Sequence, residues 1–163
     1  MTEFSYVAGS ERDTDRLGGA LSAALPTSAT IALCGTLGAG KTRLVQAIAA
    51  ACGIPREEVV SPTFVLCHEY HGNRTIYHLD AYRLTGAEEL RALGIDEYFS
   101  ADALTIIEWA DRILPALPAD YLQINIEIIS PNTRHFAITP IGSSLANVLS
   151  SLQSGLHSSS SEN

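Results

Sequence analysis

Residues 30–42 read TIALCGTLGAGKT, a short apolar run that leads directly into a glycine-rich loop. The apolar part is β-branched at its start, which is typical of a strand that helices cover on both faces of a parallel sheet. From Lys41 onward apolar side chains recur at helical spacing, until Cys52 and Gly53 offer a helix stop before Pro55. The segment therefore predicts a strand, a loop and a helix in direct succession.

The loop at residues 35–42 matches the pattern G-x-x-x-x-G-K-[ST] in full. Its glycines permit positive φ angles, so that successive backbone N–H groups can face phosphate oxygens at the start of the helix. Lys41 is the only lysine of the chain and would reach the β- and γ-phosphates, while the Thr42 hydroxyl would ligate magnesium. An ordinary glycine-rich turn is the weaker interpretation, because this loop lies between a buried strand and an amphipathic helix.

The composition predicts one folded domain and excludes several classes of protein. In 163 residues, 46% are hydrophobic and 17% are charged, which is enough apolar material for a packed core. A net charge of -8 repels a phosphate backbone, so any nucleic acid is expected to be held by a partner. The three cysteines have no C-x-x-C spacing, which fits a reducing cytoplasm. The sequence also has no apolar stretch long enough to predict a membrane-spanning helix.

The nucleotide is expected to be ATP. GTP-binding P-loop proteins read guanine through an N-K-x-D motif, and the only lysine of this chain already lies in the phosphate loop. The L-S-G-G-Q segment of ABC-type dimers is missing too. These absences favour a small, stand-alone ATPase or kinase.

Alternating and apolar runs elsewhere predict further strands. One is expected near residues 4–7, and two antiparallel hairpins are expected from residues 64–70 with 75–79 and from 121–129 with 134–139. The apolar run at residues 103–107 predicts another buried strand. The expected fold is α/β, a three-layer P-loop NTPase with a central mixed, partly parallel sheet flanked by helices and antiparallel hairpins.

Capping signals predict two more helices. Ser10 with Asp13 predicts one over about residues 10–24, and Thr85 with Glu88 predicts another to about residue 94. After residue 142 the pattern weakens, so residues 1–142 are expected to form the ATPase domain, and residues 143–163 a disordered, serine-rich extension.

Two carboxylates follow predicted strands and are candidates for the chemistry. A P-loop enzyme needs an acidic residue at a neighbouring strand end, to hold the magnesium shell or to orient the attacking water. Glu108 follows the buried run, and Asp80 follows the first hairpin. Capping of the next turn is the alternative for each. Thr63, in the segment SPTF, is a candidate switch residue facing the γ-phosphate, or simply a threonine that starts a strand.

Cysteine and histidine side chains of the first hairpin give a further possible site, for zinc. Cys67, His68, His71 and His78 fall on alternating faces of the predicted strands, which scatters them and argues against a common metal.

Taken together, the blocks GTLGAGKT, SPTF, HLDAYRL and IIEWADRI, in this order and spacing, resemble the bacterial TsaE (YjeE) family over about residues 1–140. The resemblance implies a small cytoplasmic ATPase of tRNA threonylcarbamoyladenosine biosynthesis. It also implies work with the TsaD–TsaB complex, which modifies adenosine next to the anticodon in tRNAs that read codons beginning with A. This chain would drive or reset that complex and would meet tRNA only through it.

The resemblance also carries the family's functional positions onto this sequence. ATP would be bound by Gly38, Ala39, Gly40, Lys41, Thr42, Arg43 and Thr63; the catalytic positions would be Lys41, Asp80 and Glu108; and Mg²⁺ would be held by Thr42 and Glu108. Which carboxylate positions water stays open. The chain departs from the family pattern at Thr36, Arg43 and Ala81, where aspartate, threonine and leucine are common.

Three functions remain as alternatives at this point. The first is a partner-activated ATPase. The second is a small-molecule kinase, in which Arg83 and Arg91 would belong to a lid over the phosphates. The third is a nucleotide-sensing module that needs no turnover, for which Glu108→Gln would leave function intact while Lys41→Ala would abolish it.

Overall fold

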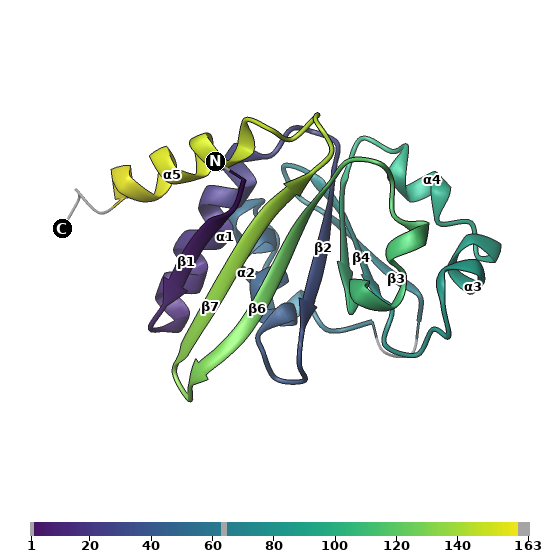
Figure 1. Cartoon of the computed structure of the whole chain (residues 1–163), viewed down its shortest axis with the longest axis horizontal. Coiled ribbons are helices and arrows are strands. Elements are labelled where there is room, and N and C mark those ends of the chain that lie inside the picture. Colours follow the sequence, from purple (N-terminus) through teal and green to yellow (C-terminus); the bar gives the residue numbers. More distant parts are fainter. Residues whose placement is uncertain (1, 63–64, 160–163) are drawn as a thin grey trace.

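The computed structural model describes residues 2–62 and 65–159, and its centre is a seven-stranded sheet (Figure 1). The strands follow one another across the sheet in the order β1 (Phe4–Ala8), β7 (Thr133–Ile141), β6 (Tyr121–Ser130), β2 (Ala29–Gly35), β5 (Leu104–Glu108), β4 (Thr75–Asp80) and β3 (Cys67–His71). The four central strands β6, β2, β5 and β4 run parallel, and the outer pairings are antiparallel. The predicted mixed, partly parallel sheet with two antiparallel hairpins is confirmed.

Helices cover both faces of this sheet, because the central strands alternate between two apolar cores. Ile31 and Leu33 of β2 face the core beneath α1 (Glu11–Ala24), α2 (Lys41–Ala51) and α5 (Val148–Ser159). Ala32 faces the opposite core, which α3 (Ala87–Ala92) and α4 (Asp96–Phe99) cover together with the short 3₁₀ turns Ala110–Arg112 and Leu114–Ala116. A further 3₁₀ turn at Arg56–Glu58 follows α2.

Helix α1 begins as its capping residues predict and packs closely on α2. The Ser10 hydroxyl accepts a hydrogen bond from the Asp13 backbone N–H at 3.3 Å, and the Asp13 carboxylate accepts one from the N–H of Gly9 at 2.9 Å. Where α1 crosses α2, a Cβ atom at Gly18 would lie 2.5 Å from the Cβ of Ala47. Glycine is therefore what lets the two helices approach, and this brings the start of α1 close to the phosphate loop.

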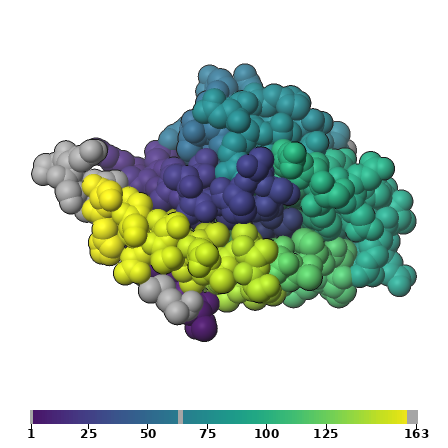
Figure 2. All heavy atoms as spheres, turned by 90° about the horizontal axis from the view of Figure 1, so that it is seen from above, coloured from purple at the N-terminus to yellow at the C-terminus, as the bar shows by residue number. Residues whose placement is uncertain are grey.

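Most of the C-terminal extension forms a helix, which corrects the prediction of a disordered tail up to residue 159; residues 160–163 lie outside the described residues. Residues 148–159 form α5, and its buried apolar side chains belong to the main core together with Leu145 just before the helix; those of α5 are Val148, Leu149, Leu152 and Leu156. Their spacing makes one helical stripe, which the intervening serines obscured. Figure 2 shows these C-terminal residues lying against the N-terminal part of the chain, where α5 packs on α1.

The region between β4 and β5 also differs from its prediction. Helix α3 spans only Ala87–Ala92, and Glu89, not Glu88, accepts hydrogen bonds from the backbone N–H and the hydroxyl of Thr85, at 2.9 and 2.8 Å. Helix α4 was not predicted, because four residues are too few to show a period. No helix in residues 2–62 and 65–159 is long and apolar enough to cross a membrane.

Candidate nucleotide site

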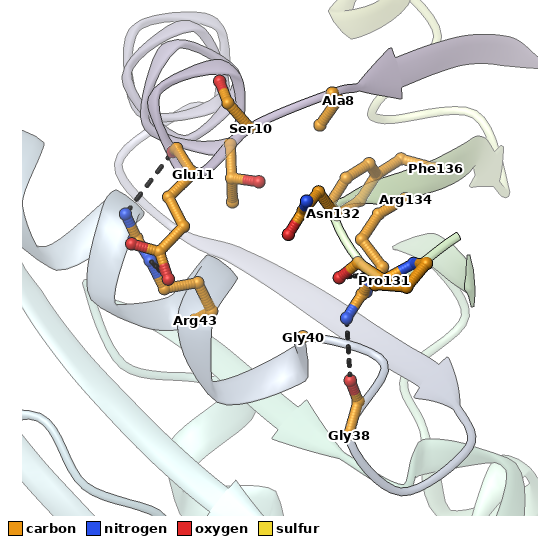
Figure 3. Close-up of a pocket in the computed structure, with 12 residues that line it drawn as sticks. Ala8, Ser10, Glu11, Gly38, Gly40, Arg43, Pro131, Asn132, Arg134 and Phe136 are labelled. Carbon is orange, nitrogen blue, oxygen red and sulfur yellow. Dashed lines mark hydrogen bonds and ion pairs between the residues drawn. The ribbon is translucent and has the colours of Figure 1, made fainter. Parts of the chain in front are cut away.

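The phosphate loop connects β2 to α2 at the carboxyl edge of the parallel strands. Gly38 and Gly40 have φ angles of +80° and +112°, as the motif predicts, and Gly40 is the N-cap residue of α2. The carbonyl oxygens of Gly38 and Ala39 accept hydrogen bonds from Arg134 of β7, at 3.4 and 3.0 Å (Figure 3). The loop is thus held from outside by a guanidinium that the sequence did not single out.

Lys41 is buried inside the loop, with 5% of its surface exposed. Its ammonium group donates to the carbonyl oxygens of Gly35 and Thr36 at 2.7 and 2.9 Å, and it lies 3.8 Å from the centre of the Trp109 ring. Burial lowers the pKa of Lys41, an effect that the nearby carboxylates, Glu108 first among them, oppose. The ammonium group therefore already sits at the loop, held by ligands that phosphate oxygens could replace.

The two predicted carboxylates lie side by side. Asp80 ends β4, Glu108 ends β5, and they are register partners in the parallel pairing of these strands. The Thr42 hydroxyl lies 2.8 and 3.0 Å from the two carboxylate oxygens of Glu108, which is 3% exposed. Asp80 accepts hydrogen bonds from the Ser61 hydroxyl at 2.7 Å and from the Tyr82 backbone N–H at 2.8 Å.

These groups line one cavity of about 530 Å³, which we call the inner cavity. Its lining includes the side chains of Lys41, Thr42, Asp80, Glu108 and Trp109. The structure therefore brings together every residue for which a catalytic role was predicted. Thr63 lies outside the described residues, so its predicted switch role stays a prediction.

Trp109 has a backbone conformation that few side chains adopt. Its φ of 58° is the one positive value recorded for a non-glycine residue within the described ranges. The ring is 4.9 Å from that of Tyr82, and the guanidinium of Arg112 lies over both rings. This backbone turn places the tryptophan ring directly against the Lys41 ammonium group.

A second cavity of about 550 Å³, the outer cavity, adjoins the loop on the side of α1 (Figure 3). It is lined by the start of α1, at residues 8–11 and Thr14, and by the turn and strand at residues 131–136. Gly38, Gly40 and Arg43 line both cavities. The two cavities therefore meet along the phosphate loop.

Arg43, predicted to bind nucleotide, is tied to α1. Its guanidinium donates to the Asp15 carboxylate at 2.7 Å, and Asp15 also accepts from Arg56 at 2.5 Å, while Glu11 lies 3.9 Å from the Arg43 Nε. Burial raises the pKa of Asp15, but the hydrogen bonds from Arg56 and Arg43 outweigh it and hold that pKa below its ordinary value. Another nitrogen of Arg43, Nη1, is buried without a hydrogen-bond partner.

The donor set at Thr42 and Glu108 suits magnesium. Mg²⁺ prefers oxygen ligands and is usually held by one or two protein groups, with the rest of its shell supplied by phosphates and water. Within the described residues no group of three or more His, Cys, Asp or Glu side chains is arranged to hold a metal ion. The hydroxyl and carboxylate oxygens fit an ion that is shared with a nucleotide.

The arginine pair expected of a kinase lid is not held over the inner cavity. Arg91 donates to the carbonyl oxygen of Pro115, which fastens α3 to the turn at Leu114–Ala116. Neither Arg91 nor Arg83 is among the residues that line the inner cavity.

The comparison with known proteins agrees with the resemblance stated from the motifs. The family model of the threonylcarbamoyl adenosine biosynthesis protein TsaE matches residues 8–136, which include the loop, both carboxylates and Arg134. The chain belongs to the TsaE family. This family takes part in the biosynthesis of threonylcarbamoyladenosine in tRNA.

Individual TsaE proteins match most of the chain. The tRNA threonylcarbamoyladenosine biosynthesis protein TsaE of Treponema pallidum is 35% identical, over 81% of this chain and 97% of its own length. Its counterpart in Rickettsia bellii is 36% identical, over 85% and 96%. The crystal structure of YdiB from Bacillus subtilis superposes with a TM-score of 0.76 at 28% identity, over 98% of each chain, so the structural match includes most of α5.

Proposed function

We propose that this TsaE-family protein is a magnesium-dependent ATPase whose turnover serves threonylcarbamoyladenosine modification of tRNA. The observation that carries the proposal is the pairing of Thr42 with Glu108, 2.8 Å apart, beside the buried Lys41 of a complete phosphate loop. A hydroxyl, a carboxylate and a lysine in this arrangement are the protein groups that P-loop NTPases use for Mg²⁺ and the terminal phosphates.

In this proposal the nucleotide occupies both cavities. The phosphates would lie in the inner cavity, where Lys41 could exchange the carbonyl oxygens of Gly35 and Thr36 for phosphate oxygens. The nucleoside would lie in the outer cavity, which combines the apolar Phe136 with polar groups such as Ser10 and Asn132. Gly38, Gly40 and Arg43 line both cavities, which is what a nucleotide that spans the loop requires.

The two carboxylates take different roles in this scheme. Glu108 is already hydrogen-bonded to Thr42, so this pair would hold Mg²⁺. When bound, the ion would act as a Lewis acid on the phosphate oxygens. Asp80 lies on the same cavity and is only partly buried, so its carboxylate is the one placed to accept a hydrogen bond from the attacking water. Lys41 stabilises the negative charge that develops on the transferred phosphoryl group.

Partners are part of the proposal. The TsaE proteins matched here are named for tRNA threonylcarbamoyladenosine biosynthesis, and a chain with a net charge of -8 is a poor ligand for tRNA by itself. As the family resemblance implies, we propose that it works with the TsaD–TsaB complex, which would present tRNA. Exposed apolar side chains at the inner cavity, Leu37 at 83% and Tyr82 at 47%, would be covered by such a partner.

The experiment is ATP hydrolysis by the purified chain, alone and with TsaD and TsaB, with and without Mg²⁺. We expect slow, magnesium-dependent hydrolysis that rises with the partners and is lost in Lys41→Ala. A hydrolysis rate that does not change when TsaD and TsaB are added would contradict the proposed assembly. Transfer of phosphate to a metabolite faster than to water would instead support a kinase.

A further inference from the structure

Buried polar side chains are concentrated at the nucleotide site, and one of them has no role in the scheme above. Within the described ranges six polar or charged residues are buried; they are Thr14, Thr30, Lys41, His78, Thr105 and Glu108. Lys41 and Glu108 line the inner cavity. His78 is 0% exposed and does not line the inner cavity. It contacts the Glu108 carboxylate on the buried side of that side chain.

The contact between His78 and Glu108 is short and has a defined direction. The Nε2 atom of His78 lies 2.6 Å from Oε2 of Glu108. A carboxylate can only accept hydrogen bonds, so Nε2 carries the hydrogen and donates it. His78 is two residues before Asp80 on β4, which puts both side chains on the same face of the strand, toward Glu108 of the neighbouring strand.

The other side of the imidazole is also held. Its Nδ1 atom lies 3.4 Å from the Tyr70 hydroxyl, which in turn lies 3.3 Å from the carbonyl oxygen of Val60 and 3.2 Å from Nδ1 of His68. Ser61, the residue after Val60, donates a hydrogen bond from its hydroxyl to the Asp80 carboxylate. A series of close polar contacts therefore runs from Glu108 through β4 and β3 to the segment that also holds the second carboxylate.

This arrangement leaves Glu108 only one orientation. Oε2 receives the hydrogen bond from His78, while the Thr42 hydroxyl lies 2.8 Å from Oε1 and 3.0 Å from Oε2. Without the imidazole, the carboxylate would be free to rotate and would lack a hydrogen-bond donor on its buried side. Groups that orient a metal-binding side chain in this way typically change metal affinity by about 10- to 100-fold when they are removed.

We propose that His78 is a positioning residue, which holds the Glu108 carboxylate in the orientation that couples Mg²⁺ binding to nucleotide binding. The inference rests on the proposed function, since it presupposes that Glu108 and Thr42 take the metal. It adds to that function a residue that touches neither the metal nor the nucleotide.

The test measures nucleotide binding and not turnover. Isothermal calorimetry gives the affinity for adenylyl imidodiphosphate in EDTA and in Mg²⁺, and the ratio of the two affinities is the coupling between metal and nucleotide. The decisive pair is His78→Gln, whose amide nitrogen reaches the place of Nε2, and His78→Asn, whose amide is too short. The control is His71→Asn on the exposed side of the same hairpin.

We expect His78→Asn to reduce the coupling ratio about 10-fold or more and to leave the affinity in EDTA unchanged. His78→Gln should restore the ratio to within about threefold of the wild type, and His71→Asn should match the wild type. An unchanged ratio in His78→Asn would overturn the inference. The inference would also be overturned if His78→Asn and His78→Gln reduced the coupling ratio equally and both lost nucleotide affinity in EDTA. That result would indicate a purely structural role for His78.

The outcomes also separate this inference from the proposed function. A wild-type ratio of one would refute the proposed metal site, and the inference with it. If His78→Asn does not fold, the wild type with nitrogen-labelled histidine decides by NMR. The Nε2–H resonance of His78 should be protected from exchange and should shift when Mg²⁺ is added to the nucleotide complex. A resonance that does not move would overturn the inference.

Discussion

The inner and outer cavities meet at the same loop but are built in opposite ways. The inner cavity has buried charges at fixed positions, with Lys41 at 5% and Glu108 at 3% exposure. The outer cavity is lined by the first residues of α1, by the phosphate loop and by the turn that leads into β7. Its charged edge includes Glu11 and Arg43, which form a partly exposed network with Asp15, and the Glu11 side chain is 83% exposed. Charge–charge interactions are stronger between buried groups than between exposed ones, because water screens the exposed charges. Substitutions in the inner cavity should therefore change chemistry strongly, and those around the outer cavity should change affinity or stability modestly.

The largest effect is expected from Lys41→Ala. The lysine makes two charge-assisted hydrogen bonds that phosphate oxygens would take over, each worth roughly 1.5–3 kcal/mol. Nucleotide affinity should fall about 100-fold or more, measured by calorimetry. The fluorescence of Trp109, the only tryptophan, should no longer respond to nucleotide. Retained affinity in this variant would remove the phosphates from the inner cavity.

Glu108→Gln should separate turnover from binding. The substitution keeps the size of the side chain and removes the charge that would hold Mg²⁺, so hydrolysis should fall about 100-fold, while affinity for nucleotide in EDTA stays within about threefold. Steady-state rates and calorimetry measure the two quantities. Glu127→Gln, on an exposed position of β6, is the matched control and should behave like the wild type. Normal hydrolysis by Glu108→Gln would refute the assigned role.

Arg134→Ala tests how much the link between β7 and the phosphate loop contributes to nucleotide binding. Without the guanidinium, the carbonyl oxygens of Gly38 and Ala39 lose their donors, and the loop loses its link to β7. We expect nucleotide affinity to fall about 10-fold, with a smaller change in the rate constant of hydrolysis at saturating ATP. A variant with unchanged affinity but slow turnover would show that Arg134 acts on the chemistry instead.

Asp15→Asn should have the smallest effect and should act on stability. The folded state lowers the pKa of Asp15, so its carboxylate stabilises the fold above the ordinary pKa of 3.8, and this contribution disappears as the pH falls through the lowered pKa. Arg43 and Arg56 face Asp15, and Glu11 lies on the other side of the Arg43 ion pair. At pH 7 we expect a loss of about 0.5–1 kcal/mol, discounted for partial exposure.

Urea unfolding at neutral pH and near pH 2 measures this contribution. The difference between the wild type and Asp15→Asn should be present at neutral pH and absent in acid. A difference of the same size at both values would mean that the carboxylate does not act through its charge.

The inner cavity could be predicted from the sequence because it depends on local patterns and on one topological rule. The loop motif is contiguous, and Asp80 and Glu108 each follow an apolar run that reads as a strand. Parallel strands place their carboxyl ends at one edge of a sheet, which is why two strand-end carboxylates were sensible candidates for one site. The structure places them as register partners.

The remaining parts of the site required information that lies between distant segments. Arg134 reaches the loop because β6 pairs with β2 and carries β7 with it, and no local pattern gives that strand order. His78 was weighed only as a scattered zinc ligand, because the face it occupies becomes known only once β4 is paired with β5. The leucines of α5 were overlooked because serines fill the positions between them.

A crystal structure of the chain with Mg²⁺ and adenylyl imidodiphosphate would test the central claim most directly. We predict Mg²⁺ between Thr42 and Glu108, the terminal phosphates against Lys41, and the adenine ring in the outer cavity beside Phe136. A metal ion bound away from Glu108, or a nucleoside outside the outer cavity, would contradict it.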